Sequence, residues 1–86
     1  MIIEKKTWPI PFQSILDGAK TFDVRLADFD ARPGDTLVLK EFDPTLGQYT
    51  GREIKKEITY IQNTKDAEFW TNEEIERYGL QVFAFK

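Results

Sequence analysis

The chain has no cysteine and no histidine among its 86 residues. Without cysteine there can be no disulfide framework and no thiolate zinc site, and without histidine a metal would find only oxygen ligands in the protein. Nucleophilic catalysis by cysteine or by a histidine-assisted serine is excluded as well. We therefore expect no metal and no cofactor, which leaves the chemistry of lysine, carboxylates and hydroxyls.

Positive charge and long apolar runs are also scarce. Acidic residues outnumber basic ones by 15 to 12, giving a net charge of −3, and no basic stripe is available to neutralise the phosphates of a long nucleic acid. No stretch approaches the ~18 apolar residues of a membrane span, and the N-terminus has no signal-peptide pattern. We expect a cytoplasmic protein that binds a small, weakly charged ligand and no membrane.

The residues that are present suit one small folded domain, which we place over residues 1–86. Apolar residues make up 41% of the chain and charged residues 31%, a balance typical of globular rather than disordered proteins. There are no internal repeats, linkers or low-complexity tracts. We expect the domain to fold alone and to be a monomer.

Short strands with local turns between them dominate the pattern. The expected strands are residues 1–7, 20–26, 37–42, 52–61 and 80–86, in which apolar residues alternate with polar ones or form short runs. The spacing of a strand–helix–strand unit is not evident. We therefore expect an α+β fold in which about five antiparallel strands close into a small barrel with two short helices.

The helices and one turn are predicted from residues that favour particular backbone angles. Pro9 suits the first turn of a helix that ends at Gly18. A second helix should follow Thr71, whose hydroxyl can form a capping box with Glu74. Pro33-Gly34 predicts a type II turn, because proline presets φ at its second position and glycine accepts the positive φ at its third.

The most unusual stretch follows the first helix. Lys20, Asp23 and Arg25 place opposite charges in a segment that we expect to be a strand. Strict alternation would put Lys20 on the opposite face from Asp23, unless a bulge turns both side chains toward one pocket. The pattern therefore indicates either a functional site or an exposed ladder of ion-paired side chains.

Three segments together resemble a known family. The stretch Gly18–Arg25 after a short helix, the Gly34-Asp35 turn and the run Asp43–Arg52 resemble the ASCH domain family, a branch of the PUA-like β-barrels, and in particular a small ASCH-like subgroup of unknown function. The resemblance extends from about residue 6 to the last expected strand and implies the same barrel. Some ASCH-like proteins are small amidohydrolases that cleave N4-acylcytidines.

The resemblance also implies catalytic residues. Lys20 matches the lysine of the amidohydrolases, and Glu68, three residues before the capping Thr71, is the candidate for their glutamate. Asp23 stands where those enzymes have a threonine, and Thr21 is the nearest hydroxyl. Because neighbouring carboxylates favour the charged form of a lysine, we expect Lys20 to stabilise an oxyanion while Asp23 or Glu68 activates a water.

The remaining candidates would bind the substrate. Arg25 should anchor a carboxylate or a carbonyl through its planar fork, and Trp8, Phe29 and Trp70 are candidates to stack on a base. These aromatic residues could equally belong to the core, and Glu68 could be an ordinary solvated carboxylate. We expect a hydrolase that cleaves the amide of N4-acylcytidine to cytidine and a carboxylic acid. A non-catalytic RNA- or nucleotide-binding module and an interaction domain are the alternatives.

Overall fold

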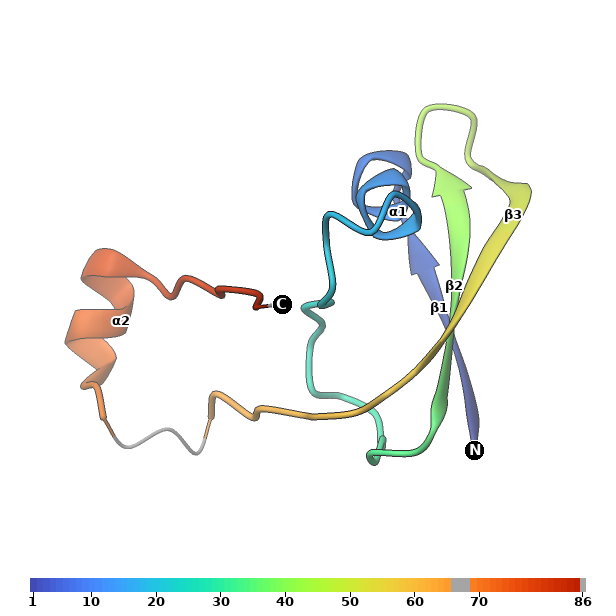
Figure 1. The fold of residues 1–86 in the computed structure, drawn as a ribbon. Coiled ribbons are helices and arrows are strands. Elements are labelled where there is room, and N and C mark those ends of the chain that lie inside the picture. The colour runs from blue at the N-terminus through green and yellow to red at the C-terminus, as the bar shows by residue number, and fades with distance from the viewer. Residues whose placement is uncertain (66–68, 86) are drawn as a thin grey trace.

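The computed structural model describes residues 1–65 and 69–85, which form one sheet and two helices (Figure 1). In chain order the elements are strand β1 (Ile2–Thr7), helix α1 (Pro9–Leu16), strands β2 (Thr36–Asp43) and β3 (Gln48–Glu57), and helix α2 (Asn72–Tyr78). Neither helix in this part of the chain has the length and apolar character that crossing a membrane requires.

The sheet has three strands in the order β1-β2-β3, with β2 in the centre. β1 runs parallel to β2, with Ile2 opposite Thr36, whereas β2 and β3 form an antiparallel hairpin. The expected closed barrel of five antiparallel strands is therefore wrong, because the sheet is open and contains a parallel pair. The broader expectation of a small α+β fold with two short helices agrees with the structure.

Two of the expected strands are missing from the sheet. Residues 20–26 and 80–85 are not in strand conformation. Residues 8–35 instead form the crossover from β1 to β2, and α1 lies within it. Parallel strands need a connection of a dozen residues or more, so the expectation that no strand–helix–strand unit exists was also wrong.

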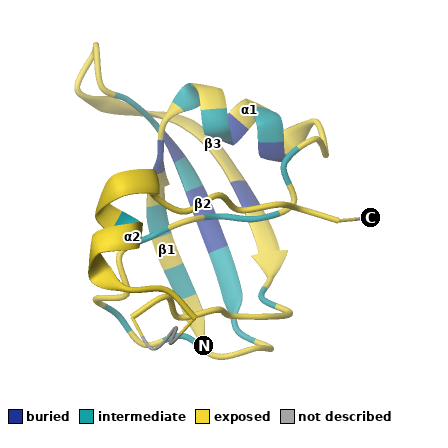
Figure 2. Cartoon of the chain, turned by 90° about the vertical axis from the view of Figure 1, so that its left-hand side faces the viewer, coloured by how far each residue is buried: buried dark blue, intermediate teal, exposed yellow. Residues whose placement is uncertain are grey.

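Helix α1 packs on one face of the sheet, toward the ends of β1 and β2, and forms the core with it (Figure 2). Phe12 and Ile15, three residues apart on one side of the helix, are buried against Leu39 of β2 and Ile54 of β3. The helix ends as predicted, since Gly18 has a φ of +82° and its amide donates to the carbonyl of Ile15. This core is small, and it lies directly beneath the segment that follows the helix.

The predicted turn at Gly34 is confirmed by its backbone geometry, and a second glycine lies at a bulge in the hairpin. In the turn from Arg32 to Asp35 the amide of Asp35 donates to the carbonyl of Arg32 at 3.0 Å, and Gly34 has a φ of +98°. That geometry is a type II turn. Gly51 has a φ of +93° and lies where the β2–β3 register shifts opposite Glu41, so it accommodates a bulge.

A buried carboxylate fixes this bulge to the rest of the domain. Glu41 accepts hydrogen bonds from Thr50 Oγ1 at 2.6 Å and from Arg52 Nε and Nη2 at 3.0 and 2.9 Å. These bonds, first from Arg52 and then from Thr50, hold the pKa of Glu41 below its ordinary value, and the same contact raises the pKa of Arg52. Arg52 Nη2 also donates to Gln13 of α1, which links the hairpin to the helix.

The C-terminal part of the chain stands away from the sheet (Figure 1). The predicted capping box is present, with Thr71 Oγ1 accepting from the Glu74 amide and Glu74 Oε1 accepting from the Thr71 amide. No residue of α2 is fully buried. The expected closing strand over residues 80–86 is not formed in its described part, 80–85, where every residue is exposed.

Candidate functional site

Arg25 organises the irregular segment that follows α1. Its Nε donates to Asp23 Oδ2 at 2.6 Å, its Nη1 to the carbonyl of Lys6 at 2.6 Å, and its Nη2 to Thr7 Oγ1 at 2.7 Å. All three nitrogens of the guanidinium thus donate hydrogen bonds within the protein. Charge-assisted bonds of this length are strong ones, so the segment is fixed to the end of β1.

The start of this segment is fixed to α1 as well. The amide of Lys20 donates to the carbonyl of Ser14 at 3.0 Å, in the last turn of the helix. Lys20 is half-buried, and its Nζ lies 5.3 Å from the centre of the Phe22 ring. The backbone of Lys20 is therefore held by the helix, while that of Lys6 is held to Arg25.

Between these elements lies a surface pocket of about 270 Å³, which we call the Lys20 pocket. It is lined by Lys6, Thr7, Trp8, Pro11, Lys20, Asp23, Val24 and Arg25. The end of β1, the beginning of α1 and the irregular segment each contribute to it. Its volume is slightly below the range typical of ligand pockets, about 300–1,000 Å³, which suits a single base rather than an oligonucleotide.

The charges in the Lys20 pocket are one ion pair and two lysines, of which Lys6 has its ammonium 4.0 Å from the centre of the Phe42 ring. Asp23 and Arg25 form a half-buried ion pair at 2.6 Å, with side chains 15% and 26% exposed. None of the ion pairs among residues 1–65 and 69–85 includes Lys20. The pocket therefore combines a carboxylate held in place by an arginine with an ammonium group that can meet developing negative charge.

The structure brings together half of the residues predicted for the site. Lys20, Asp23, Arg25 and Trp8 all line the Lys20 pocket. Thr21 does not line it and is exposed.

The other predicted residues lie elsewhere. Phe29 packs under the ammonium of Lys5, which lies 3.5 Å from its ring centre. Trp70 contacts Phe69 in the C-terminal part of the chain, at 5.8 Å between ring centres. Glu68 lies outside the described residues.

Sequence reasoning missed four of the lining residues: Lys6, Thr7, Pro11 and Val24. Thr7 is the most informative of them, because it is 4% exposed and its hydroxyl oxygen accepts from Arg25. A threonine hydroxyl is one donor and two acceptors, so Thr7 keeps a proton to donate. Its position in the sequence, at the end of a strand and directly before the Trp8-Pro9 helix start, does not by itself distinguish it as a site residue.

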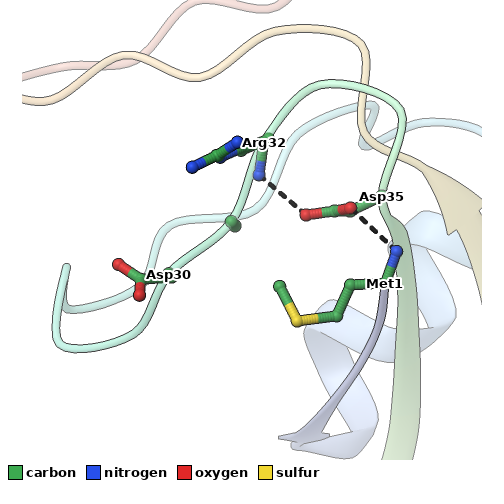
Figure 3. A pocket seen from close by; sticks show the side chains of 5 residues that line it. Met1, Asp30, Arg32 and Asp35 are labelled. Atoms are coloured by element: carbon green, nitrogen blue, oxygen red, sulfur yellow. Dashed lines mark hydrogen bonds and ion pairs between the residues drawn. The ribbon is translucent and has the colours of Figure 1, made fainter.

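A second, larger hollow of about 410 Å³ lies at the other end of β1 (Figure 3). Its central group is Asp35, which accepts from the amino group of Met1 at 3.0 Å and from the backbone amide of Arg32 at 2.9 Å. These two bonds lower the pKa of Asp35. One of its oxygens is therefore committed to the N-terminal amino group and the other to the turn, and we regard this Asp35 hollow as structural.

Comparison with known proteins places the chain in a family without assigning an activity. None of the curated proteins compared with the chain matches it significantly. A family model described as a domain of unknown function, DUF3850, matches residues 2–74. The matched range includes the sheet, α1 and every residue of the Lys20 pocket. The chain therefore belongs to the DUF3850 family.

Proposed function

We propose that the chain is a small amidohydrolase that binds a modified cytidine in the Lys20 pocket and hydrolyses its N4-acyl amide. The observation that carries this proposal is the meeting of Lys20, Asp23, Arg25 and Trp8 at one pocket. Lys20 matches the lysine of the ASCH-like amidohydrolases, Asp23 stands where those enzymes have a threonine, and Arg25 belongs to the stretch that resembles the ASCH family. Trp8 adds an aromatic ring suited to a base. The proposal requires that these side chains meet at one pocket, and it does not require the closed five-stranded barrel that the resemblance implied.

The chemistry requires a nucleophile, a proton carrier and a group that stabilises negative charge. In the proposed reaction Asp23 accepts a proton from a water as the water oxygen bonds to the acyl carbon. Lys20 stabilises the oxyanion that forms on the acyl oxygen. The C–N bond then breaks, the proton passes from Asp23 to the departing N4 amine, and the products are cytidine and a carboxylic acid.

Arg25 and Trp8 have supporting roles in this scheme. Arg25 holds Oδ2 of Asp23 at 2.6 Å, and we assign the other carboxylate oxygen, Oδ1, to the water. Trp8 is 60% exposed at the pocket, so its ring can stack on a base without first leaving the core. Arg25 is a positioning residue, because its donors are used by Asp23, Lys6 and Thr7.

The proposed site of action is the cytoplasm. The chain contains no cysteine, so its folding requires no oxidising compartment. A modified nucleoside is the proposed small-molecule partner.

Incubation of the protein with N4-acetylcytidine, with chromatographic detection of cytidine, tests the proposal. We expect turnover by the unmodified chain and a loss of about 10²–10⁴ in rate for Asp23→Asn, the usual contribution of a positioned general base. Lys20→Ala should lose activity to a similar or greater degree. Lys55→Ala removes an exposed lysine of β3 outside the pocket and should leave the rate unchanged.

Each contrary outcome has a distinct meaning. If Asp23→Asn retains turnover while Glu68→Gln abolishes it, Glu68 is the base and Asp23 only positions its neighbours. If the chain releases no cytidine but binds RNA oligomers in a salt-sensitive manner, it is a non-catalytic binding module. Absence of both turnover and nucleoside binding would refute the proposal.

A further inference from the structure

The C-terminal arm, by which we mean the described residues 58–65 and 69–85, exposes an unusual amount of apolar surface. Phe83 and Phe85 are 71% and 87% exposed. Six more large apolar side chains of the arm are at least two-fifths exposed: Tyr60, Phe69, Trp70, Tyr78, Leu80 and Val82. Scattered exposed apolar residues are normal, but a concentration of this kind marks an interaction surface.

The dimensions of the whole chain lead to the same conclusion. Its accessible surface is 7459 Å², about 2,200 Å² more than the ~5,300 Å² expected for a compact monomer of 10.1 kDa. Its radius of gyration is 14.6 Å, compared with about 12 Å for a compact domain of this length. The excess lies within the ~1,000–2,500 Å² that each chain buries in an obligate homodimer.

The region around α1 exposes a second group of apolar side chains. Ile10 of α1 and Val24 and Leu26 of the irregular segment are 82%, 66% and 81% exposed. The arm does not cover them on its own molecule. Strand β3 is a poor surface for pairing with another chain, because its second half carries four charged residues and its ladder is interrupted at the bulge. Both features protect a sheet edge from pairing.

We propose that the chain forms a two-fold symmetric dimer in which the C-terminal arm of each copy packs on the apolar side chains of the α1 region of the other. A two-fold axis uses the same pair of surfaces twice and closes the assembly. The segment that the arm would cover, from Lys20 to Leu26, also forms one wall of the Lys20 pocket. In the proposed dimer, the arm of one copy therefore covers this wall of the Lys20 pocket in the other copy.

Size-exclusion chromatography with multi-angle light scattering tests the proposal on the full chain. The expected mass is twice 10.1 kDa over micromolar to submillimolar concentrations. The double variant Phe83→Glu and Phe85→Glu should raise the dimer dissociation constant about 30-fold or more, the effect of removing a central aromatic anchor. Both side chains are exposed, so circular dichroism of this variant should match that of the unmodified chain.

A matched control separates the arm from apolar exposure in general. Leu46 at the β2–β3 hairpin is 65% exposed and lies outside both proposed surfaces, so Leu46→Glu should remain dimeric. The proposal is overturned if the unmodified chain has the mass of one copy at every concentration. An arm that folds onto the sheet of its own molecule would give that result. The proposal is equally overturned if the double variant remains dimeric.

Discussion

Replacing Arg25 with alanine should destabilise the domain far more than the substitution of an ordinary surface charge. The change removes three hydrogen bonds of 2.6, 2.6 and 2.7 Å from a side chain that is 26% exposed. Each bond from a charged donor contributes about 1.5–3 kcal/mol, but water replaces part of this at a partly exposed site. We expect a net loss of about 2–4 kcal/mol, a large part of the ~4–13 kcal/mol total for a domain of this length.

Urea unfolding followed by tryptophan fluorescence measures this loss, and Trp8 beside the Lys20 pocket makes the signal sensitive to the region. The melting temperature should fall by about 10–25 °C. Arg25→Lys keeps the charge but cannot make the three bonds together, so most of the loss should persist. Arg32→Ala, which removes an exposed guanidinium from the same crossover, should change stability by less than about 0.5 kcal/mol. A similar small change for Arg25→Ala would refute our interpretation.

Three further predictions concern the fold. Leu39→Ala, at a position 1% exposed, should cost about 2–5 kcal/mol in urea unfolding; a loss below 1 kcal/mol would contradict the assigned core. Gly34→Val should cost about 1–3 kcal/mol through strain at a φ of +98°, although a side chain meets open space there. The pKa values of Asp35 and Glu41 are lowered from 3.8 and 4.5, so their contribution to stability is complete above about pH 4.5 and is lost as the pH falls further. Glu41→Gln should flatten this acid dependence in pH-dependent melting curves.

Local features of the fold were predictable from the sequence, and strand pairing was not. The ends of α1, the turn at Gly34 and the Thr71-Glu74 capping box depend on backbone angles and bonds within a few residues. Strand direction depends on contacts between distant segments, and alternation of side chains carries no information about it. The parallel pairing of β1 and β2 was missed for this reason.

Part of the candidate site was predicted, but the backbone arrangement expected to bring its residues together was not the one observed. Lys20 and Asp23 were expected to share a pocket only if a strand contained a bulge. In the structure no strand forms there, because Arg25 binds the end of β1 instead of pointing to solvent. Thr7 was missed, since a hydroxyl at the end of a strand has no distinctive pattern, and its role depends on a partner 18 residues away.

A nuclear magnetic resonance titration of the ¹⁵N-labelled chain with cytidine, the proposed product, tests most directly whether the Lys20 pocket is the functional site. The Lys20 pocket and the Asp35 hollow lie at opposite ends of β1, so the same spectra compare the two sites. We predict saturable shifts of the Thr7, Lys20 and Asp23 amides and of the Trp8 indole, with the Asp35 amide unaffected. Shifts confined to the Asp35 hollow, or no shifts at millimolar cytidine, would contradict the account.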